Sequence, residues 1–184
     1  NFTVVTAENQ TKGKGQMGAI WDSEPSKNLI MSVLVADFVT DINQIFDINI
    51  VVSVSILQVL EDFSIPELSI KWPNDIMSYN KKIGGILIEN SIKSDGSINS
   101  IVGLGLNVNQ INFENLPKAS SLAIICKKAF DKEEILLKII ENLKNEYISI
   151  KCFKKQVHIN KIPINENDII LFINLVNSGG FNKT

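Results

Sequence analysis

Arginine, histidine and cysteine are scarce in this 184-residue sequence. Arginine is absent, so all 18 basic residues are lysines, and lysine cannot form the bidentate contact that a guanidinium makes with phosphate or carboxylate. Histidine occurs once, at His158, which excludes a histidine-rich metal site. The two cysteines, Cys126 and Cys152, lie 26 residues apart and form no metal-binding pair, so we expect reduced thiols in a cytoplasmic protein.

Long apolar runs and a large excess of charge are also missing. No run reaches the ~18 apolar residues that a membrane-spanning helix needs, so we expect no membrane association. A formal net charge of -2 gives no reason to expect a nucleic-acid partner. With 45% hydrophobic residues, the sequence is typical of a globular protein with one full-sized core. It begins with Asn1, directly on a strand-like run, so we expect it to be N-terminally incomplete.

The pattern of apolar residues predicts an α+β fold. Short turns join the later strands into hairpins, which argues against a parallel, doubly wound sheet. Residues 9–28 are polar and glycine-bearing, and we expect a long loop there. We divide the sequence into a main domain, 1–150, and a partial β appendage, 151–184, with a strand-like run at 168–176. Strands are predicted at residues 2–6, 28–36, 67–72, 83–90 and 97–109, and helices at residues 47–63 and 132–150.

The predicted loop contains GKGQMG at residues 13–18, which matches the Gly-x-Gly-x-x-Gly pattern of a dinucleotide-binding turn. That turn needs a helix directly after its glycines to hold the pyrophosphate. Only nine residues separate the last glycine from the next predicted strand, and Pro25 lies among them, so a crossover helix has no room. A Walker A loop is excluded because Gly15 follows the Gly-Lys pair. Two interpretations stay open: a loop whose N–H groups, Lys12 and Lys14 wrap an anion, or a solvated hairpin loop.

A second dense stretch begins at Lys71-Trp72-Pro73-Asn74-Asp75. It places a cation, an aromatic ring, an amide and a carboxylate at a strand end, and the predicted hairpin brings Lys82 back towards Asn74 and Asp75. Further along, Gly103 and Gly105 alternate on one face of a predicted strand, where glycine weakens pairing and indicates a close approach. Asp75 could instead cap a turn, and the glycines could mark a bulge or tight packing.

Together these segments resemble the biotin protein ligases, which join biotin to a lysine of a carrier protein. The resemblance covers roughly residues 3–147, and the Lys-Trp-Pro-Asn-Asp box is its most specific part. It implies a mixed, largely antiparallel central sheet with helices packed on it, as in class II synthetases. The matching motifs are Gln10-x-x-Gly13-Lys14-Gly15-x-x-Gly18 followed by Trp21, the Lys-Trp-Pro-Asn-Asp box with Lys82 and Gly85, and Gly103-x-Gly105-x-Asn107.

The resemblance implies a two-step, ATP-dependent ligation. Biotin's carboxylate attacks the α-phosphate of ATP, with Mg²⁺, to give biotinyl-5′-AMP, and a lysine of a biotin carboxyl carrier protein then attacks the mixed anhydride. The first step brings two anions together, so Lys82 and Lys14 are the expected catalytic cations, with Asp75 as a base or Mg²⁺ contact. The expected biotin and adenylate contacts are Gln10, Gly13, Lys14, Gly15, Gln16, Lys82, Gly85, Gly103 and Gly105, and the expected nucleotide contacts are Trp21, Asn74 and Asn107.

The sequence departs from the family in three places. The family's Ser-Thr-Asn segment, which binds biotin and the adenylate, would lie upstream of Asn1. Many members carry arginines within the glycine loop, where this chain has Lys14, Gln16 and Met17; Lys14 keeps the charge but not the bidentate geometry, so we expect a weaker hold on the adenylate. The family's small C-terminal β domain is at best partly present in residues 151–184. No DNA-binding helix-turn-helix is recognisable, so we expect no repressor function.

Two other functions stay open. One is a lipoate ligase or octanoyltransferase of the same fold, although the extended Gly-Gly-Gly signature of those families is absent from the sequence. The other is a non-catalytic biotin- or adenylate-binding module, which the presence of Lys82 and Asn74 argues against. Because relatives often pair through the sheet edge, a homodimer is a further expectation.

Overall fold

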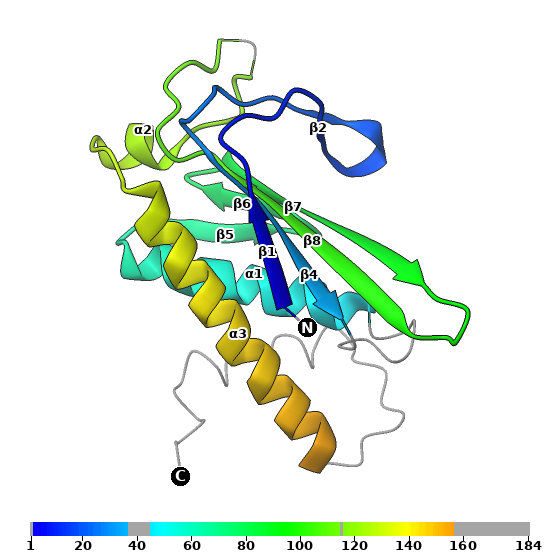
Figure 1. Ribbon diagram of the computed structural model, residues 1–184. Coiled ribbons are helices and arrows are strands. Elements are labelled where there is room, and N and C mark those ends of the chain that lie inside the picture. Colours follow the sequence, from blue (N-terminus) through cyan, green and yellow to red (C-terminus); the bar gives the residue numbers. More distant parts are fainter. Residues whose placement is uncertain (1, 37–44, 115, 157–184) are drawn as a thin grey trace. The chain divides into compact units, whose positions relative to one another are not determined.

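The structure is a computed structural model, and it describes residues 2–36, 45–114 and 116–156 (Figure 1). The chain divides into two compact units, Asn1–Tyr147 and Ile148–Thr184. All the strands described below belong to the first unit, and only the end of one helix is described in the second. The predicted strand at 168–176 lies outside the described residues. The division into domains at 150 and 151 stays a prediction.

A six-stranded sheet forms the centre of the first unit, with the strand order β1-β4-β8-β7-β6-β5. All its neighbouring strands pair antiparallel, which confirms the predicted α+β fold with a largely antiparallel sheet. The turn of the β7–β8 hairpin contains Gly96 at a φ of 83°, a conformation that favours glycine. The strands are β1 (Phe2–Thr6), β4 (Leu29–Ala36), β5 (Leu68–Lys71), β6 (Asp75–Ser78), β7 (Lys81–Ile92) and β8 (Ile98–Leu106).

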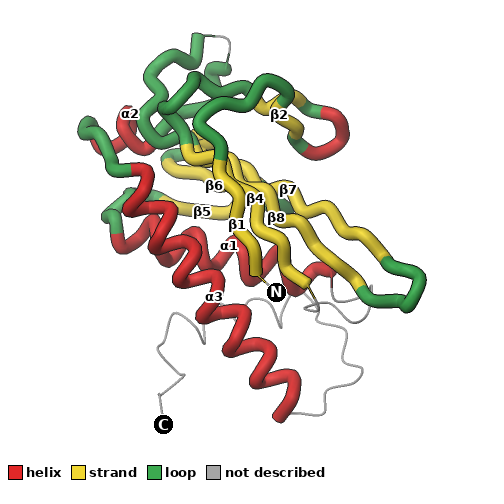
Figure 2. Tube along the Cα trace, in the orientation of Figure 1, coloured by secondary structure: helices red, strands yellow, loops and turns green. Residues whose placement is uncertain are grey.

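Two long helices, α1 (Ile45–Asp62) and α3 (Lys132–Gln156), pack on one face of this sheet, and both predicted helices are thereby confirmed (Figure 2). Val33 and Val102 point to that face, where they meet Val51 of α1 and Leu143 of α3. Burial follows the helical spacing of the apolar residues, and each fully buried aliphatic side chain stabilises the fold by roughly 1.5–3 kcal/mol. No helix in the described part of the chain is long and apolar enough to span a membrane. Fully buried helix residues include Ile56, Leu60, Ile135 and Ile139.

Alternation along the strands points a second set of residues to the opposite face, away from α1 and α3. On β8, Val102, Leu104 and Leu106 are buried, whereas the intervening Gly103 and Gly105 lie on the other face and are half-buried. The same alternation places Ser32 of β4 on that face, opposite Gly103. The glycine positions predicted to share one face do so.

Two predictions about local structure are wrong. Residues 67–72 and 83–90 do not pair directly, because β6 lies between them and pairs with β5 on one side and β7 on the other. Residues 9–28 are not entirely a loop: β2 (Gly13–Lys14) and β3 (Ile20–Trp21) form a small hairpin around a 3₁₀ turn, Gln16–Gly18. Both misses involve strands of two to four residues, which are too short to show a hydrophobic period.

One short helix, α2 (Leu122–Cys126), is absent from the sequence-based prediction. It begins after Ser121, whose Oγ accepts a hydrogen bond from the Ile124 N–H at 3.3 Å. Five residues give too little periodicity to predict a helix. The capping serine was the available signal.

Candidate functional site

A cavity of about 380 Å³ opens on the sheet face that the helices leave free. Its walls come from the glycine loop, from the strand end at Asn74 and Asp75, and from the glycine-bearing strands β7 and β8. The fold therefore brings the three sequence motifs to one place. A cavity of this volume suits a small organic ligand.

Glycines form the floor of the cavity. Gly85 of β7 pairs with Gly105 of β8, and Gly103 pairs with Leu87. The Trp21 indole lies directly over this floor. A Cβ at Gly105 would come within 2.5 Å of Trp21 Cε2, and one at Gly85 within 3.2 Å of Cζ3. Any side chain at Gly105 would therefore collide with the indole.

Lys82 provides a cation beside the floor. Its Nζ lies 2.6 Å from Oδ1 of Asp75 and 5.7 Å from the centroid of the Trp21 ring. The predicted approach of Lys82 to Asp75 is confirmed. The Lys82 side chain keeps 34% of its surface exposed, so an incoming anion can reach the ammonium. Lys71 is a second, weaker partner of Asp75, at 3.9 Å.

Main-chain bonds fix the positions of Lys82 and Asn74. The Lys82 N–H donates to the Lys118 carbonyl at 2.8 Å, and the Lys82 carbonyl accepts from Ser120 N–H at 2.9 Å. The Asn74 side-chain amide donates to the Ile86 carbonyl at 3.2 Å, and the Ile86 N–H donates back to the Asn74 carbonyl at 2.9 Å. Main-chain bonds thus fix the backbone of both residues, while the ion pair with Asp75 holds the ammonium and the bond to Ile86 holds the amide.

The tip of the glycine loop covers the cavity with few contacts. Lys14, Gly15 and Gln16 line the cavity, and the Gly15 N–H donates to the Ala19 carbonyl at 2.7 Å, which closes the hairpin. Met17 has a φ of 53° and a fully exposed side chain, and Ile20 is 86% exposed. The tip is consequently attached to the rest of the unit mainly through the chain on either side of it.

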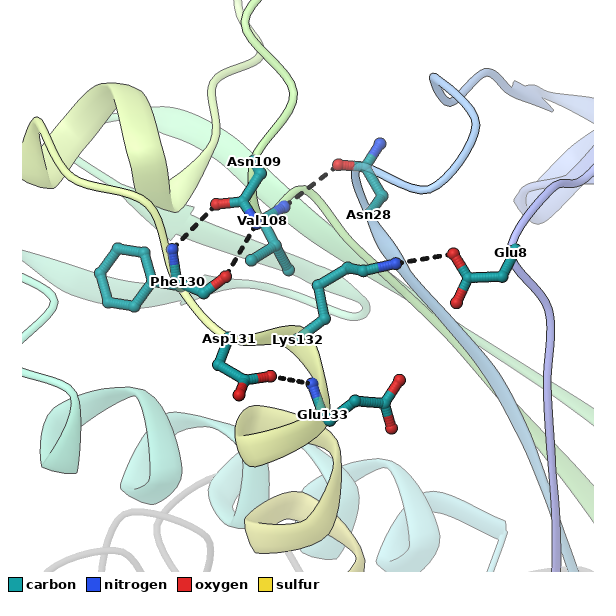
Figure 3. Close-up of polar contacts among 8 residues, drawn as sticks. All are labelled: Glu8, Asn28, Val108, Asn109, Phe130, Asp131, Lys132 and Glu133. Carbon is teal, nitrogen blue, oxygen red and sulfur yellow. Dashed lines mark hydrogen bonds and ion pairs between the residues drawn. The ribbon is translucent and has the colours of Figure 1, made fainter.

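Buried amides hold the base of the same loop. The Asn28 Oδ1 accepts from the Val108 N–H at 3.1 Å, and its Nδ2 donates to Gln110 Oε1 at 2.5 Å (Figure 3 draws the first of these). The same Gln110 oxygen accepts from the Glu24 N–H at 3.2 Å. Asn28 is 2% exposed, so these bonds are shielded from water. The segment after the loop is therefore tied to the end of β8.

An ion pair joins the segment before the loop to helix α3. Lys132 Nζ lies 2.9 Å from Glu8 Oε2 (Figure 3). Hydrogen bonds from Lys132 and then Ser26 lower the pKa of the Glu8 carboxyl below its ordinary value. Close by, Asn109 donates to the Phe130 carbonyl at 2.8 Å and accepts from its N–H at 3.0 Å. Both ends of the loop thus meet one polar cluster at the start of α3.

Most of the predicted site residues line the cavity. Two do not: Gly13 lies in a neighbouring groove beneath the loop, and Asn107 is buried, with its Nδ2 donating to the Ser120 carbonyl at 3.0 Å. The predicted residues that share the cavity are Gln10, Lys14, Gly15, Gln16, Trp21, Asn74, Asp75, Lys82, Gly85, Gly103 and Gly105.

The cavity also includes residues for which the motifs predicted no role. Ser32 had a signal, because it is the one polar residue in the apolar run LIMSVLVA of β4. Lys12 was noted as part of the loop but not as a site residue. Leu87, Glu89 and Ile101 also line the cavity: Leu87 pairs with Gly103, and Glu89 pairs with Ile101, which only the strand register reveals.

The chain is similar in sequence to known proteins over the part that contains these residues. A family model described as the biotin/lipoate A/B protein ligase family matches residues 1–107. The chain is 33% identical over 108 residues to the bifunctional ligase/repressor BirA of Bacillus subtilis, which is 59% of this chain and 33% of that protein. It is 29% identical over 148 residues to the biotin–acetyl-CoA-carboxylase ligase of Mycobacterium tuberculosis, 79% of this chain and 54% of that protein.

Among solved structures, the biotin protein ligase of Aquifex aeolicus in complex with biotin and ATP is similar, with a TM-score of 0.69 and 32% identity. The match covers 80% of this chain and 61% of that chain. The sequence thus spans between a third and about half of the length of the two curated relatives.

Proposed function

The chain belongs to the biotin/lipoate A/B protein ligase family, and on that premise we propose that it carries the catalytic site of an ATP-dependent biotin ligase. One observation carries the proposal: a single cavity joins a lysine ammonium, a floor of glycines and a basic glycine loop. The floor suits an apolar ring and chain, and the cations suit a carboxylate and a phosphate.

The first step would form biotinyl-5′-AMP. A carboxylate oxygen of biotin attacks the α-phosphorus of ATP, the bond to the β-phosphate oxygen breaks, and pyrophosphate leaves. Lys82 would contact the biotin carboxylate and the phosphoryl oxygens, exchanging part of its pairing with Asp75 for the incoming anions. Because two anions must approach each other, a fixed cation at this point lowers the barrier.

Other residues would position the two substrates. Gln10 would contact the ureido head of biotin, whose ring and chain would lie against Gly85, Gly103 and Gly105. Lys14, Gly15 and Gln16 would fold over the adenylate, with Lys14 on its phosphate. Trp21 and Asn74 would line the nucleotide. The expected nucleotide contact of Asn107 stays a prediction, since its side chain bonds Ser120 outside the cavity.

The second step would transfer the biotinyl group to a lysine of a carrier protein. The acceptor nitrogen attacks the acyl carbon, AMP leaves, and the amine loses a proton. A free lysine is neutral only to about one part in 10³ at pH 7, so a nearby carboxylate would help. Asp75 lines the cavity and keeps 18% of its side chain exposed, so it is the candidate for this role as base once Lys82 has turned to the substrate anions.

Mg²⁺ would enter with the nucleotide. Among the described residues, no group of three or more His, Cys, Asp or Glu could hold a metal ion by itself. Mg²⁺ usually binds through substrate phosphates and one or two carboxylates. Asp75 and Glu89 both line the cavity, so the residues fit a metal that neutralises ATP.

Calorimetry and mass spectrometry test the proposal. Biotin should bind alone, biotin with Mg-ATP should release pyrophosphate, and a carrier domain should then gain one biotinyl group on a lysine. Biotin binding without pyrophosphate release would favour a non-catalytic module, and turnover with lipoate in place of biotin would favour a lipoate ligase. Absence of biotin binding would end the proposal.

A further inference from the structure

Trp21 occupies the space that the glycine floor opens. Built onto Gly105, a Cβ would lie 2.5, 2.7 and 2.8 Å from Cε2, Cζ2 and Nε1 of the indole. Gly85 approaches another edge of the same ring, at 3.2 Å from Cζ3. The indole is therefore in direct contact with the glycine backbone, and no second molecule fits between them, because ordinary contacts between non-bonded carbon atoms are about 3.5–4.0 Å.

The indole is held in this place by packing and charge but not by a hydrogen bond. Its Nε1 is buried and has no hydrogen-bond partner among the described residues. A buried N–H without an acceptor is unfavourable, so the indole occupies this position at a cost in free energy. The Lys82 ammonium lies 5.7 Å from the ring centroid.

We propose that Trp21 is an internal plug: its indole occupies the glycine floor and must leave before a substrate chain can lie there. The inference rests on the proposed function, because it assigns the floor to the apolar part of biotin. Departure of the indole removes its contact with Lys82, so arrival of the chain changes the surroundings of the ammonium that would receive the carboxylate. The indole stays within reach to cover the ligand once it has moved.

The first test needs no ligand and uses two single-tryptophan variants, since the sequence holds only Trp21 and Trp72. In Trp72→Phe, the remaining Trp21 should emit at shorter wavelength and resist acrylamide quenching. In Trp21→Phe, the remaining tryptophan is Trp72, which is 49% exposed. Acrylamide should quench its emission severalfold more strongly. Equal quenching of the two tryptophans would overturn the plug.

Two floor variants in the Trp72→Phe background give a matched pair. Gly105→Ala places a methyl group inside the indole and should expel it, which raises the quenching of Trp21 severalfold and shifts its emission to the red. Gly103→Ala lies on the same strand and face, but its Cβ would meet only Leu87, at 3.3 Å or more, so Trp21 should be unaffected. The same response from both variants would overturn the inference. Circular dichroism shows whether each variant folds, and if Gly105→Ala does not, the single-tryptophan comparison decides.

Biotin titration separates the plug from the proposed function. Substrate should change the emission of Trp21 in Trp72→Phe over the concentration range in which calorimetry detects binding. Binding with an unchanged Trp21 environment overturns the plug and leaves the proposed function intact. The protein could instead fail to bind biotin while Gly105→Ala still expels a buried Trp21. That result would support the position of the indole on the glycine floor and would overturn the proposed function.

Discussion

The two halves of the cavity are built in different ways. The sheet half, with Gly85, Gly105 and Lys82, is part of continuous antiparallel ladders and rests on buried aliphatic side chains. The loop half is a hairpin of two short strands, each of two residues, and Met17 at its tip is fully exposed. Only its base is fixed, through Asn28 and the polar cluster at the start of α3.

This difference matches what each half would have to do. A cation that stabilises charge in a transition state is most effective when it is fixed in advance, and Lys82 is held by main-chain bonds on both sides. A cover must move to admit a ligand, so it belongs on a segment with few contacts. A firm base lets the tip move and return to the same place.

The largest effect is expected from Lys82→Met on the sheet half. The variant keeps the apolar stem but loses the ammonium, and biotinyl-AMP formation should fall by about 10²–10³. Pyrophosphate release measures this. Lys81→Met is the control, because Lys81 is exposed and donates to the Pro117 carbonyl away from the cavity. Equal activity of Lys82→Met and Lys81→Met would remove Lys82 from the chemistry.

Asn28→Ala tests the base of the loop half. It leaves the buried Val108 N–H without its acceptor and removes one of the two donors to Gln110 Oε1, which should lower the free energy of unfolding by about 1–3 kcal/mol. The melting temperature should fall by about 2–4 °C for each kcal/mol. Met17→Gln at the exposed tip should leave it unchanged. If the tip variant melts as early as the base variant, the two regions of the loop are not distinct.

Lys14→Ala tests the tip of the loop half. Without this ammonium the adenylate would lose a charge-assisted contact to its phosphate, and it should dissociate about tenfold faster or more. Release of biotinyl-AMP into solution, separated from formation by rapid filtration, measures the difference. Exposed Lys27 at the loop's base supplies a control, Lys27→Ala, with unchanged release. Unaltered retention in Lys14→Ala would remove Lys14 from the cover.

The sequence predicted the sheet half better than the loop half, for physical reasons. Long apolar strands such as residues 28–36 have a clear pattern, and alternation alone put Gly103 and Gly105 on one face. The turn between Asp75 and Lys82 correctly predicted their approach. Strand β6 was missed because a strand of four residues shows no hydrophobic period. The prediction that Lys82 approaches Asp75 was still correct, because the two residues lie on either side of the same turn.

The loop half could not be predicted in the same way, because its geometry depends on contacts far away in sequence. Nothing in residues 13–21 indicates that Trp21 lies on Gly105, since the two residues are far apart in the sequence and belong to different sheets. Asn28 likewise finds its partners about 80 residues later, at Val108 and Gln110. Short motifs therefore indicated the family, and long-range contacts determined which residues meet.

The smallest effect is expected from the ion pair at the base of the loop, and it depends on pH. The pKa of Glu8 lies below its ordinary value of 4.5, chiefly through the hydrogen bond from Lys132, then that from Ser26. A carboxyl with a lowered pKa in the folded state stabilises the fold fully above its ordinary pKa, and loses that contribution as the pH falls through the lowered value. At pH 7, Glu8→Gln should therefore have a slightly lower melting temperature than the native protein. The decrease should be smaller than that of Asn28→Ala, because exposed ion pairs contribute little to stability.

The difference between Glu8→Gln and the native protein should shrink as the pH falls below about 4 and should also shrink in high salt, since both treatments remove the attraction that the variant lacks. Melting temperatures between pH 3 and pH 7 measure it, with the exposed carboxylate variant Glu114→Gln as the control. A difference that stays constant down to pH 3 would mean that Glu8 holds the loop's base by packing alone. The ion pair would then add nothing to the contrast between a fixed base and a loosely attached tip.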